Sequence, residues 1–320
     1  MKTSNVILLW TLMMSIIMAL SSSSLFLLWM SLEINMMSFI PMMNSKNMMS
    51  INSMIMYFII QAMASSLFIF VFSWILINHK LILNMTSLFI SCSMLIKIGA
   101  APFHIWFPQI SEGVSMFSFL LLSTIQKMIP LYIISMFPSM MTFLSIFMSA
   151  SIGSLGGLNQ FSLRKILAFS SITHMSWMLS LTLLTCGMWI IYLLIYSIIM
   201  LLIIQIMNQF SLSIMNSMKN MYKTDLLYFI LIFLSLGGLP PMMGFFMKWM
   251  ALKIILMDSI ILTIPLILSS LVNLYFYIRV SYPIFLKNYN LNIWNTKYMN
   301  KFNLFMILNF MTIFLIVPFL

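Results

Sequence analysis

Four ionisable side chains stand inside long apolar stretches of this chain, where a charge is costly to bury: Glu33, Lys97, Lys127 and Lys248. Burying one charge at the centre of a membrane helix costs about 2.5–3.5 kcal/mol on insertion scales. Burial also disfavours the charged form of an amine, so a buried lysine can exchange a proton near neutral pH. A row of such groups, with Glu33 as the counter-ion, can pass protons through connecting water, and each charge state can bias the next.

Each lysine could instead reach the membrane surface with its amine or form a static ion pair. Lys97 and Lys248 lie beside Gly/Pro-rich interruptions, which favours proton transfer. Two histidines are weaker candidates for the same relay. His104 either extends the relay beyond Lys97 or only satisfies carbonyl groups at the interruption. His174 either links the second half of the chain to the aqueous side or is a packed polar side chain.

Two predicted membrane-spanning stretches, 81–110 and 225–257, are too long to be plain helices. Proline lacks the amide hydrogen of the helical ladder and clashes with the turn before it, so each stretch should break in its middle. Broken backbone at membrane depth persists only where protein or water surrounds it, and paired broken helices indicate an ion pathway. The residues predicted to break the helices are Gly99, Pro102, Gly237, Gly238, Pro240 and Pro241.

These residues must be positioned by helices in lipid, because the chain of 320 residues is 63% hydrophobic and only 6% charged. Soluble domains carry about a quarter charged residues. A bilayer core about 30 Å thick needs about 20 apolar residues per helix, and the stretches are too long for the strands of a membrane barrel. The sequence therefore predicts an all-α, polytopic membrane protein of about 11 transmembrane helices. The predicted spans are 4–21, 24–43, 53–78, 81–110, 115–137, 139–158, 163–185, 188–213, 225–257, 259–282 and 302–320.

The interruptions fit an internal repeat of five helices, because Pro102 and Pro240 each fall in the fourth span of a unit. The first repeat would cover 4–137, the second 139–282, and a C-terminal helix would cover 302–320. Five is odd, so the second repeat should be inverted in the membrane relative to the first.

The net charge of +11 is interpreted as basic loop residues that set the orientation of the spans in the membrane, and no nucleic-acid partner is expected. By the positive-inside rule, the N-terminus faces the matrix or cytoplasm and Leu320 faces the opposite side. The side of the N-terminus collects Lys2, Lys46, Arg164, Lys165, Lys219, Lys223, Lys287, Lys297 and Lys301, and the other side holds His79, Lys80 and Lys253.

The chain shows no motif for a metal, an iron–sulfur cluster or a nucleotide. Cys92 and Cys186 have no paired neighbour, and each is interpreted as a small buried apolar residue. Glu112 and Asp225 fall at span ends, where caps and loop charges are usual, and residues 153–157 resemble a close-packing surface.

Several motifs resemble, in order and spacing, those of the NADH-ubiquinone oxidoreductase chain 2 family. They are Leu32-Glu33-Ile34-Asn35, Lys97-Ile98-Gly99-Ala100-Ala101-Pro102-Phe103-His104, Gly156-Gly157-Leu158-Asn159-Gln160 followed by Arg164-Lys165-Ile166-Leu167-Ala168, Ser170-Ser171-Ile172-Thr173-His174, and Leu236-Gly237-Gly238-Leu239-Pro240-Pro241. The resemblance covers nearly the whole chain, and the first span and the last part of the chain are least distinctive. The eleven-span count resembles the animal mitochondrial form, and the 38 methionines are similar to what an arthropod mitochondrial genome encodes.

The resemblance implies an antiporter-like fold with two inverted five-helix repeats and two discontinuous helices, in a membrane-arm subunit of respiratory complex I. In that family a glutamate–lysine pair, a central lysine and a lysine on the second broken helix carry protons. In this sequence the pair matches Glu33 and Lys97, the central lysine matches Lys127, and the lysine on the second broken helix matches Lys248.

The resemblance also implies that this chain holds no cofactor or metal of its own. FMN, iron–sulfur clusters, NADH and ubiquinone are expected in partner subunits. The expected partners are other membrane-arm subunits of complex I and phospholipid, with cardiolipin as one candidate, and the chain should not function as an isolated monomer. Its expected place is the mitochondrial inner membrane, with the N-terminus in the matrix and the C-terminus in the intermembrane space.

Two rival functions stay open on the sequence alone. A subunit of a cation/proton antiporter shares the fold and the charged helices, and sodium-dependent transport would identify it. A non-pumping scaffold for complex I assembly predicts that Lys127→Met or Lys248→Met leaves the proton-to-electron ratio of the assembled complex unchanged.

Overall fold

In the computed structural model the chain folds as a bundle of helices, described over residues 3–45, 47–77, 83–184, 187–209, 223–240 and 242–287. The all-α prediction is confirmed for this part of the chain. The helices are α1 (Thr3–Ser21), α2 (Leu25–Met43), α3 (Met48–Ile77), α4 (Leu83–Ile98), α5 (Trp106–Gly113), α6 (Met116–Ser123), η1 (Ile125–Lys127), α7 (Met128–Met136), α8 (Met140–Leu158), α9 (Leu163–Leu184), α10 (Met188–Gln209), α11 (Lys223–Gly237), α12 (Met243–Asp258) and α13 (Ile260–Lys287).

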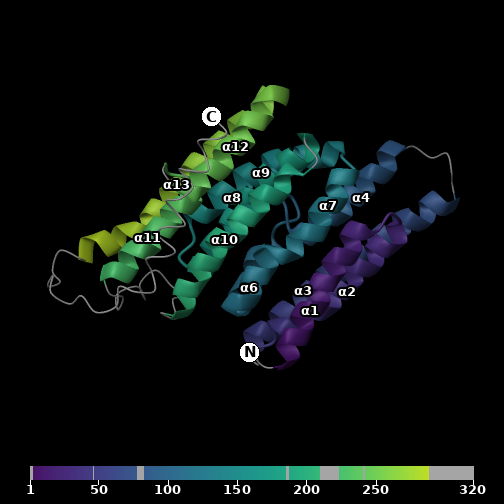
Figure 1. Ribbon diagram of the computed structural model, residues 1–320, viewed down its shortest axis with the longest axis horizontal. Coiled ribbons are helices and arrows are strands. Elements are labelled where there is room, and N and C mark those ends of the chain that lie inside the picture. The colour runs from purple at the N-terminus through teal and green to yellow at the C-terminus, as the bar shows by residue number, and fades with distance from the viewer. Residues whose placement is uncertain are drawn as a thin grey trace.

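The helices lie side by side across the bundle, and helices distant in the chain are neighbours, since α8 packs against α13 and α10 against α6 (Figure 1). Helices α1 to α3 form one edge, α11 to α13 form the opposite edge, and α8 to α10 lie between them. Seven spans within the described residues are long and apolar enough to cross a membrane. Among them α9 is the most enclosed, with 89% of its apolar window buried in the protein against 33–67% for the others. Helix α9 therefore places its side chains in the interior of the bundle.

The predicted spans from 4–21 to 259–282 each coincide with one described helix or with one interrupted series of helices. The predicted C-terminal helix over 302–320 lies outside the described residues. Several residues used to predict the topology and the breaks also lie outside them: Lys2, Lys46, His79, Lys80, Lys219, Pro241, Lys297 and Lys301. Cys186 lies outside them as well, and Cys92, interpreted as buried, is only half-buried.

Both predicted helix breaks are confirmed, but the glycines end the helices and the prolines follow. Helix α4 ends just before Gly99, which has φ +73°, and α11 ends at Gly237, just before Gly238 with φ +84°. At both ends the amide of the positive-φ glycine and the next amide bond back to carbonyl groups of the last helical turn. This is the Schellman arrangement, which glycine adopts without the penalty that a Cβ would bring. Pro102 and Pro240 lie further along the chain, in the linkers.

A third interruption, which the sequence analysis did not predict, divides the span 115–137. Helix α6 ends at Ser123, and the single 3₁₀ turn η1 connects it to α7. Pro130 explains the position, because its ring would clash with the carbonyl of Gln126 and it has no amide hydrogen to donate to that carbonyl. Lys127 is the last residue of this turn.

Two arginines donate hydrogen bonds to carbonyl groups at the ends of neighbouring helices. Arg164, at the start of α9, donates to the carbonyls of Glu112 and Val114 at the end of α5, at 2.8 and 3.1 Å. Arg279 of α13 donates to the carbonyls of Leu158 and Gln160 at the end of α8. Each contact satisfies carbonyl groups that a helix end leaves without partners.

The close-packing surface predicted for residues 153–157 is confirmed. A Cβ on Gly153 would lie 2.6 Å from the side chain of Thr173 on α9, and one on Gly157 would lie 2.9 Å from the ring of Phe276 on α13. Small residues at these places let α8 approach both helices, as is usual in membrane bundles.

Candidate functional site

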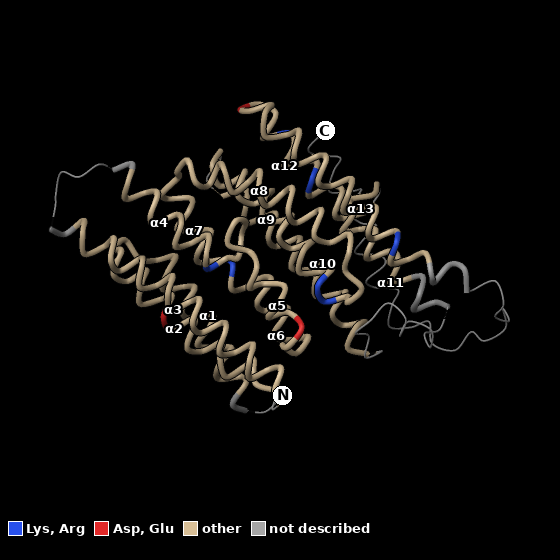
Figure 2. Tube along the Cα trace, turned by 180° about the vertical axis from the view of Figure 1, so that it is seen from behind, with Lys and Arg blue, Asp and Glu red and all other residues tan. Residues whose placement is uncertain are grey.

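The three lysines predicted inside the membrane are all enclosed by protein. Their exposed fractions are 6% for Lys97, 2% for Lys127 and 7% for Lys248. Figure 2 shows blue segments in the interior of the bundle near α7 and α12, whereas red segments lie on the outer side of α2 and at helix ends. These amines therefore do not reach the membrane surface, and the snorkelling alternative does not hold for them.

Lys97 is the last but one residue of α4, directly before the first break. Its carbonyl accepts a hydrogen bond from the side-chain amide of Gln61 at 3.1 Å, and the carbonyl of Ile96 accepts one from the indole of Trp106 at 3.1 Å. Side chains thus satisfy backbone groups that the break frees, which is what broken backbone in a membrane requires.

The amine of Lys127 lies among weak partners at the centre of the bundle. It donates to the carbonyl of Ser171 on α9 at 3.5 Å, and it lies 5.2 Å from the ring centre of Phe107 and 5.8 Å from that of Tyr196. Aromatic faces and a carbonyl stabilise an ammonium without neutralising its charge. Among the described residues no carboxylate lies within 4.0 Å of this amine.

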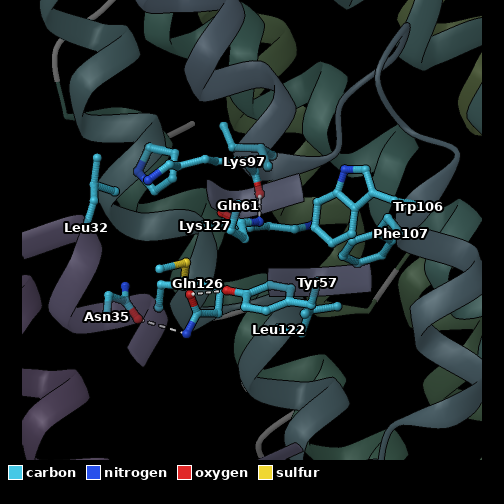
Figure 3. A pocket seen from close by; sticks show the side chains of 13 residues that line it. Leu32, Asn35, Tyr57, Gln61, Lys97, Trp106, Phe107, Leu122, Gln126 and Lys127 are labelled. Atoms are coloured by element: carbon cyan, nitrogen blue, oxygen red, sulfur yellow. Dashed lines mark hydrogen bonds between the residues drawn. The ribbon is translucent and has the colours of Figure 1, made fainter. Parts of the chain in front are cut away.

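A chain of neutral polar side chains connects α2, η1 and α3 beside the lysines (Figure 3). The amide of Gln126 donates to the side-chain oxygen of Asn35 at 2.8 Å, and the hydroxyl of Tyr57 donates to the oxygen of Gln126 at 3.3 Å. One cavity is lined by Asn35, Tyr57, Gln61, Lys97, Gln126 and Lys127. Its volume of about 20 Å³ is enough for about one water molecule. One water there would have polar partners on several sides.

Glu33 lies on α2 and is half-buried, unlike the lysines. No ion pair within 4.0 Å joins it to Lys97 among the described residues. Its role as the counter-ion stays a prediction. A proton would need an intermediate group or water to pass between them.

Lys248 lies in the first half of α12, after the second break. Its amine donates to the carbonyl of Gly237, the last residue of α11, at 2.7 Å. A cation at a helix C-terminus is favourable, because the partial negative charge of the helix dipole gathers there. The two halves of the broken helix thus form the position of the amine together.

His174 lies on α9 and is 1% exposed. Its Nδ1 is 2.9 Å from the hydroxyl of Tyr192 on α10, and its ring centre is 4.9 Å from that of Tyr196. The structure thus places His174 in the interior, on the same helix as Ser171, whose carbonyl accepts from Lys127.

The other ionisable candidates lie away from this row. His104 is half-buried in the linker between α4 and α5, with its Nδ1 3.3 Å from the carbonyl of Pro102, so a role for it stays a prediction. Glu112, the last but one residue of α5, forms an ion pair with Lys165 at 2.9 Å and accepts a hydrogen bond from Ser162. Its assignment as a charge at a span end is confirmed.

Within the described residues no group of three His, Cys, Asp or Glu side chains is placed to hold a metal ion. The side chains near the relay that were not predicted as site residues are neutral or aromatic. They are Asn35, Tyr57, Gln61, Gln126, Tyr192 and Asn273, each of which is buried or half-buried and hydrogen-bonded near a predicted relay residue.

Comparisons with known proteins identify the family of the chain. Residues 22–274 match the family model described as NADH:quinone oxidoreductase/Mrp antiporter, TM. NADH-ubiquinone oxidoreductase chain 2 of Anopheles gambiae is 43% identical over 314 residues, which cover 94% of this chain and 91% of the relative. The corresponding proteins of Aedes aegypti and Rhipicephalus sanguineus are 40% and 39% identical over 98% and 96% of this chain and over 96% and 99% of their own. These relatives agree with the arthropod resemblance.

Solved structures share the fold. A chain of respiratory complex I from Thermus thermophilus superposes with a TM-score of 0.77 at 21% identity, over 88% of this chain and 70% of that one. A chain of the Mrp complex from Dietzia sp. gives a TM-score of 0.73 at 17% identity, over 85% of this chain and 59% of that one. The antiporter-like fold is therefore shown. The family match and the close relatives together establish that this chain belongs to the NADH-ubiquinone oxidoreductase chain 2 family.

Proposed function

We propose that this chain is a core membrane-arm subunit of respiratory complex I that moves protons across the mitochondrial inner membrane through a buried relay. The relay comprises Glu33, Lys97, Lys127, His174 and Lys248, and NADH-to-ubiquinone electron transfer in partner subunits drives it. Membership of the complex rests on relatives of that name along nearly the whole chain. The chain is a multi-pass protein of that membrane, assembled with other membrane-arm subunits.

The observation that carries the proposal is the enclosed arrangement of Lys127, His174 and Lys248. Each is at most 7% exposed, and none meets a carboxylate within 4.0 Å among the described residues. The ring of Tyr196 lies near both Lys127 and His174, with its centre 5.8 Å from the amine and 4.9 Å from the imidazole centre. A purely structural ion pair would place an acid against each amine, since an unpaired buried charge is destabilising. Groups held without such a partner can take up and release a proton.

The proposed steps each move one proton through a side chain or an intervening water. The ammonium of Lys127 gives a proton to His174, which leaves a neutral amine and an imidazolium. The imidazolium then gives a proton to the neutral amine of Lys248. On the other side, the cavity beside Asn35 and Gln126 supplies the polar path between Lys97 and Lys127.

Two further features of the architecture belong to the proposal. The segments 4–137 and 139–282 are taken as inverted repeats, supported by the matching Schellman ends at Gly99 and Gly238 in the fourth span of each. The N-terminus is placed in the matrix and the C-terminus in the intermembrane space. Phospholipid, with cardiolipin as one candidate, is expected around the bundle.

The test is the number of protons moved per NADH oxidised by the assembled complex in sealed vesicles. Lys127→Met and Lys248→Met remove an amine from the relay, so each should lower this ratio while the complex still assembles. Lys253→Met is the matched control, because Lys253 lies on the same helix as Lys248 with an exposed side chain. An unchanged ratio in both relay variants would support the scaffold alternative instead, and transport that depends on sodium would support the antiporter alternative.

A further inference from the structure

The hydroxyl of Tyr192 is the hydrogen-bond partner of His174 in the interior. The oxygen lies 2.9 Å from Nδ1, and both side chains are almost fully buried, at 2% and 1% exposed. Tyr192 is on α10 and His174 is on α9, so the bond also connects two helices. Because Nδ1 is occupied, the imidazole has one nitrogen left for exchange, which is Nε2.

A hydroxyl is a suitable partner for a group that changes its charge. When Nδ1 carries its hydrogen, it donates to the hydroxyl oxygen, and this bond is the same whether Nε2 is bare or protonated. The contact with Tyr192 can therefore persist whether the imidazole is neutral or charged. His174 can change its protonation state without losing its place.

The free nitrogen of His174 is buried and has no hydrogen-bond partner among the described residues. The side-chain oxygen of Asn273, on α13, is buried in the same way. Asn273 lies close to the histidine, since its amide nitrogen donates to Thr173, the residue before His174, at 2.5 Å. Two unsatisfied polar atoms in one interior region are a usual place for ordered water.

We infer that Tyr192 is a positioning residue of the relay, which holds Nδ1 of His174 so that Nε2 is the nitrogen that receives and releases the proton. This inference rests on the proposed function, because it assigns a part within the step from Lys127 to Lys248. Without the hydroxyl, the ring can turn and present either nitrogen. The proton path then loses its fixed geometry while the buried packing remains.

The variant Tyr192→Phe tests the inference in the assembled complex, since it removes one oxygen and keeps the ring. The number of protons moved per NADH oxidised should fall, by part or all of the loss seen in His174→Gln, with assembly retained. Tyr132→Phe is the matched control: its hydroxyl lies 3.5 Å from the carbonyl of Leu20 on α1. That control should keep the ratio of the unmodified complex.

The double variant Tyr192→Phe with His174→Gln separates a positioning role from a merely structural one. If Tyr192 acts through His174, the double variant should have the ratio of His174→Gln alone, because coupled residues are not additive. Losses that add would overturn the inference. An unchanged ratio in Tyr192→Phe, with lowered ratios in Lys127→Met and Lys248→Met, overturns this inference alone. Unchanged ratios in the lysine variants overturn the proposed function as well.

A second measurement needs no variant. A map of the unmodified complex that resolves water should show Nδ1 within about 3.2 Å of the Tyr192 oxygen and a water on Nε2. A histidine ring turned the other way, with Nε2 on the tyrosine, would contradict the assignment.

Discussion

At the scale of single residues, Lys127 illustrates how the interior treats an amine that must change its charge. Its partners are one carbonyl and two aromatic faces, at 3.5, 5.2 and 5.8 Å. These groups stabilise an ammonium less than a carboxylate would, and they do not oppose the neutral amine. The charged and neutral states can therefore be close in free energy, which a proton relay needs.

The amide of Gln126 gives a prediction at this scale, because it supports both Asn35 and Tyr57. Gln126→Met leaves the oxygen of Asn35 without its donor and the hydroxyl of Tyr57 without its acceptor. Each lost buried partner costs about 1–3 kcal/mol. We expect a lower temperature of thermal dissociation of the complex and a lower proton-to-electron ratio.

The matched control is Gln109→Met, because Gln109 is exposed on α5. It should change neither quantity. If Gln126→Met behaved like Gln109→Met, the polar chain beside the lysines would have no part in proton movement.

The charged relay residues could be predicted from the sequence because each is a rare residue type within an apolar stretch. Their neutral partners could not. Asn35 and Gln126 are 91 residues apart, and serine, asparagine and tyrosine occur widely in these spans, so nothing in the sequence singles out this pair. Only the packing of α2 against η1 brings them together.

At the scale of elements, the relay depends on where helices stop. Two stops come from glycines with positive φ, and a third comes from Pro130 acting on the carbonyl of Gln126. A lysine lies at each helix end. Lys97 is two residues before Gly99, and Lys127 is the last residue of η1. Gly238 lies against the side chain of Lys248. The broken backbone therefore sets the positions of all three lysines.

The glycine pair at the second break offers a matched prediction. Gly238→Ala forces a Cβ into a backbone with φ +84° and within 3.2 Å of the amine of Lys248. A non-glycine residue in such a conformation costs about 1–3 kcal/mol. We expect reduced stability and a lower proton-to-electron ratio, measured on the assembled complex in vesicles.

Gly237→Ala is the control for that variant. Its Cβ would meet Tyr277 at 3.5 Å, an ordinary contact, and Gly237 is still helical. The control should be close to the unmodified protein. Equal effects of the two substitutions would mean that the conformation at Gly238 does not position Lys248.

The two long breaks were predictable because glycine and proline mark them in stretches too long for one helix. The break at η1 was missed because the predicted span 115–137 has an ordinary length. Pro130 was the available signal, in the interior of the span, but a proline is tolerated in a membrane helix where neighbouring groups satisfy the freed backbone. The sequence could not decide between a break and a continuous helix at that place.

At the scale of the whole molecule, the helical fold follows from the lipid that surrounds the chain. A chain with 63% hydrophobic residues must cross lipid repeatedly, and the helical bundle and the antiporter-like fold were predicted from that and from the motifs. The mean hydropathy of α9, 1.3, is the lowest of the seven spans, and this agrees with its position in the interior. Its many serines and threonines face other helices instead of lipid.

The inverted repeat and the sides of the termini stay predictions. Several of the charged loop residues on which the topology rests lie outside the described residues, so the structure does not test the positive-inside argument at those places. Within the described residues, the ion pair of Glu112 with Lys165 and the bonds of Arg164 join the two predicted repeats. A displacement of α5 would therefore act on α9, the helix that carries His174.

The most direct measurement is a map of the assembled complex in which ordered water is resolved around the buried amines. We expect an unbroken series of side chains and waters, with each polar atom within about 3.2 Å of the next, from Lys97 through Lys127 and His174 to Lys248. Dry apolar packing between Lys127, His174 and Lys248 in every state of the working complex would contradict the relay.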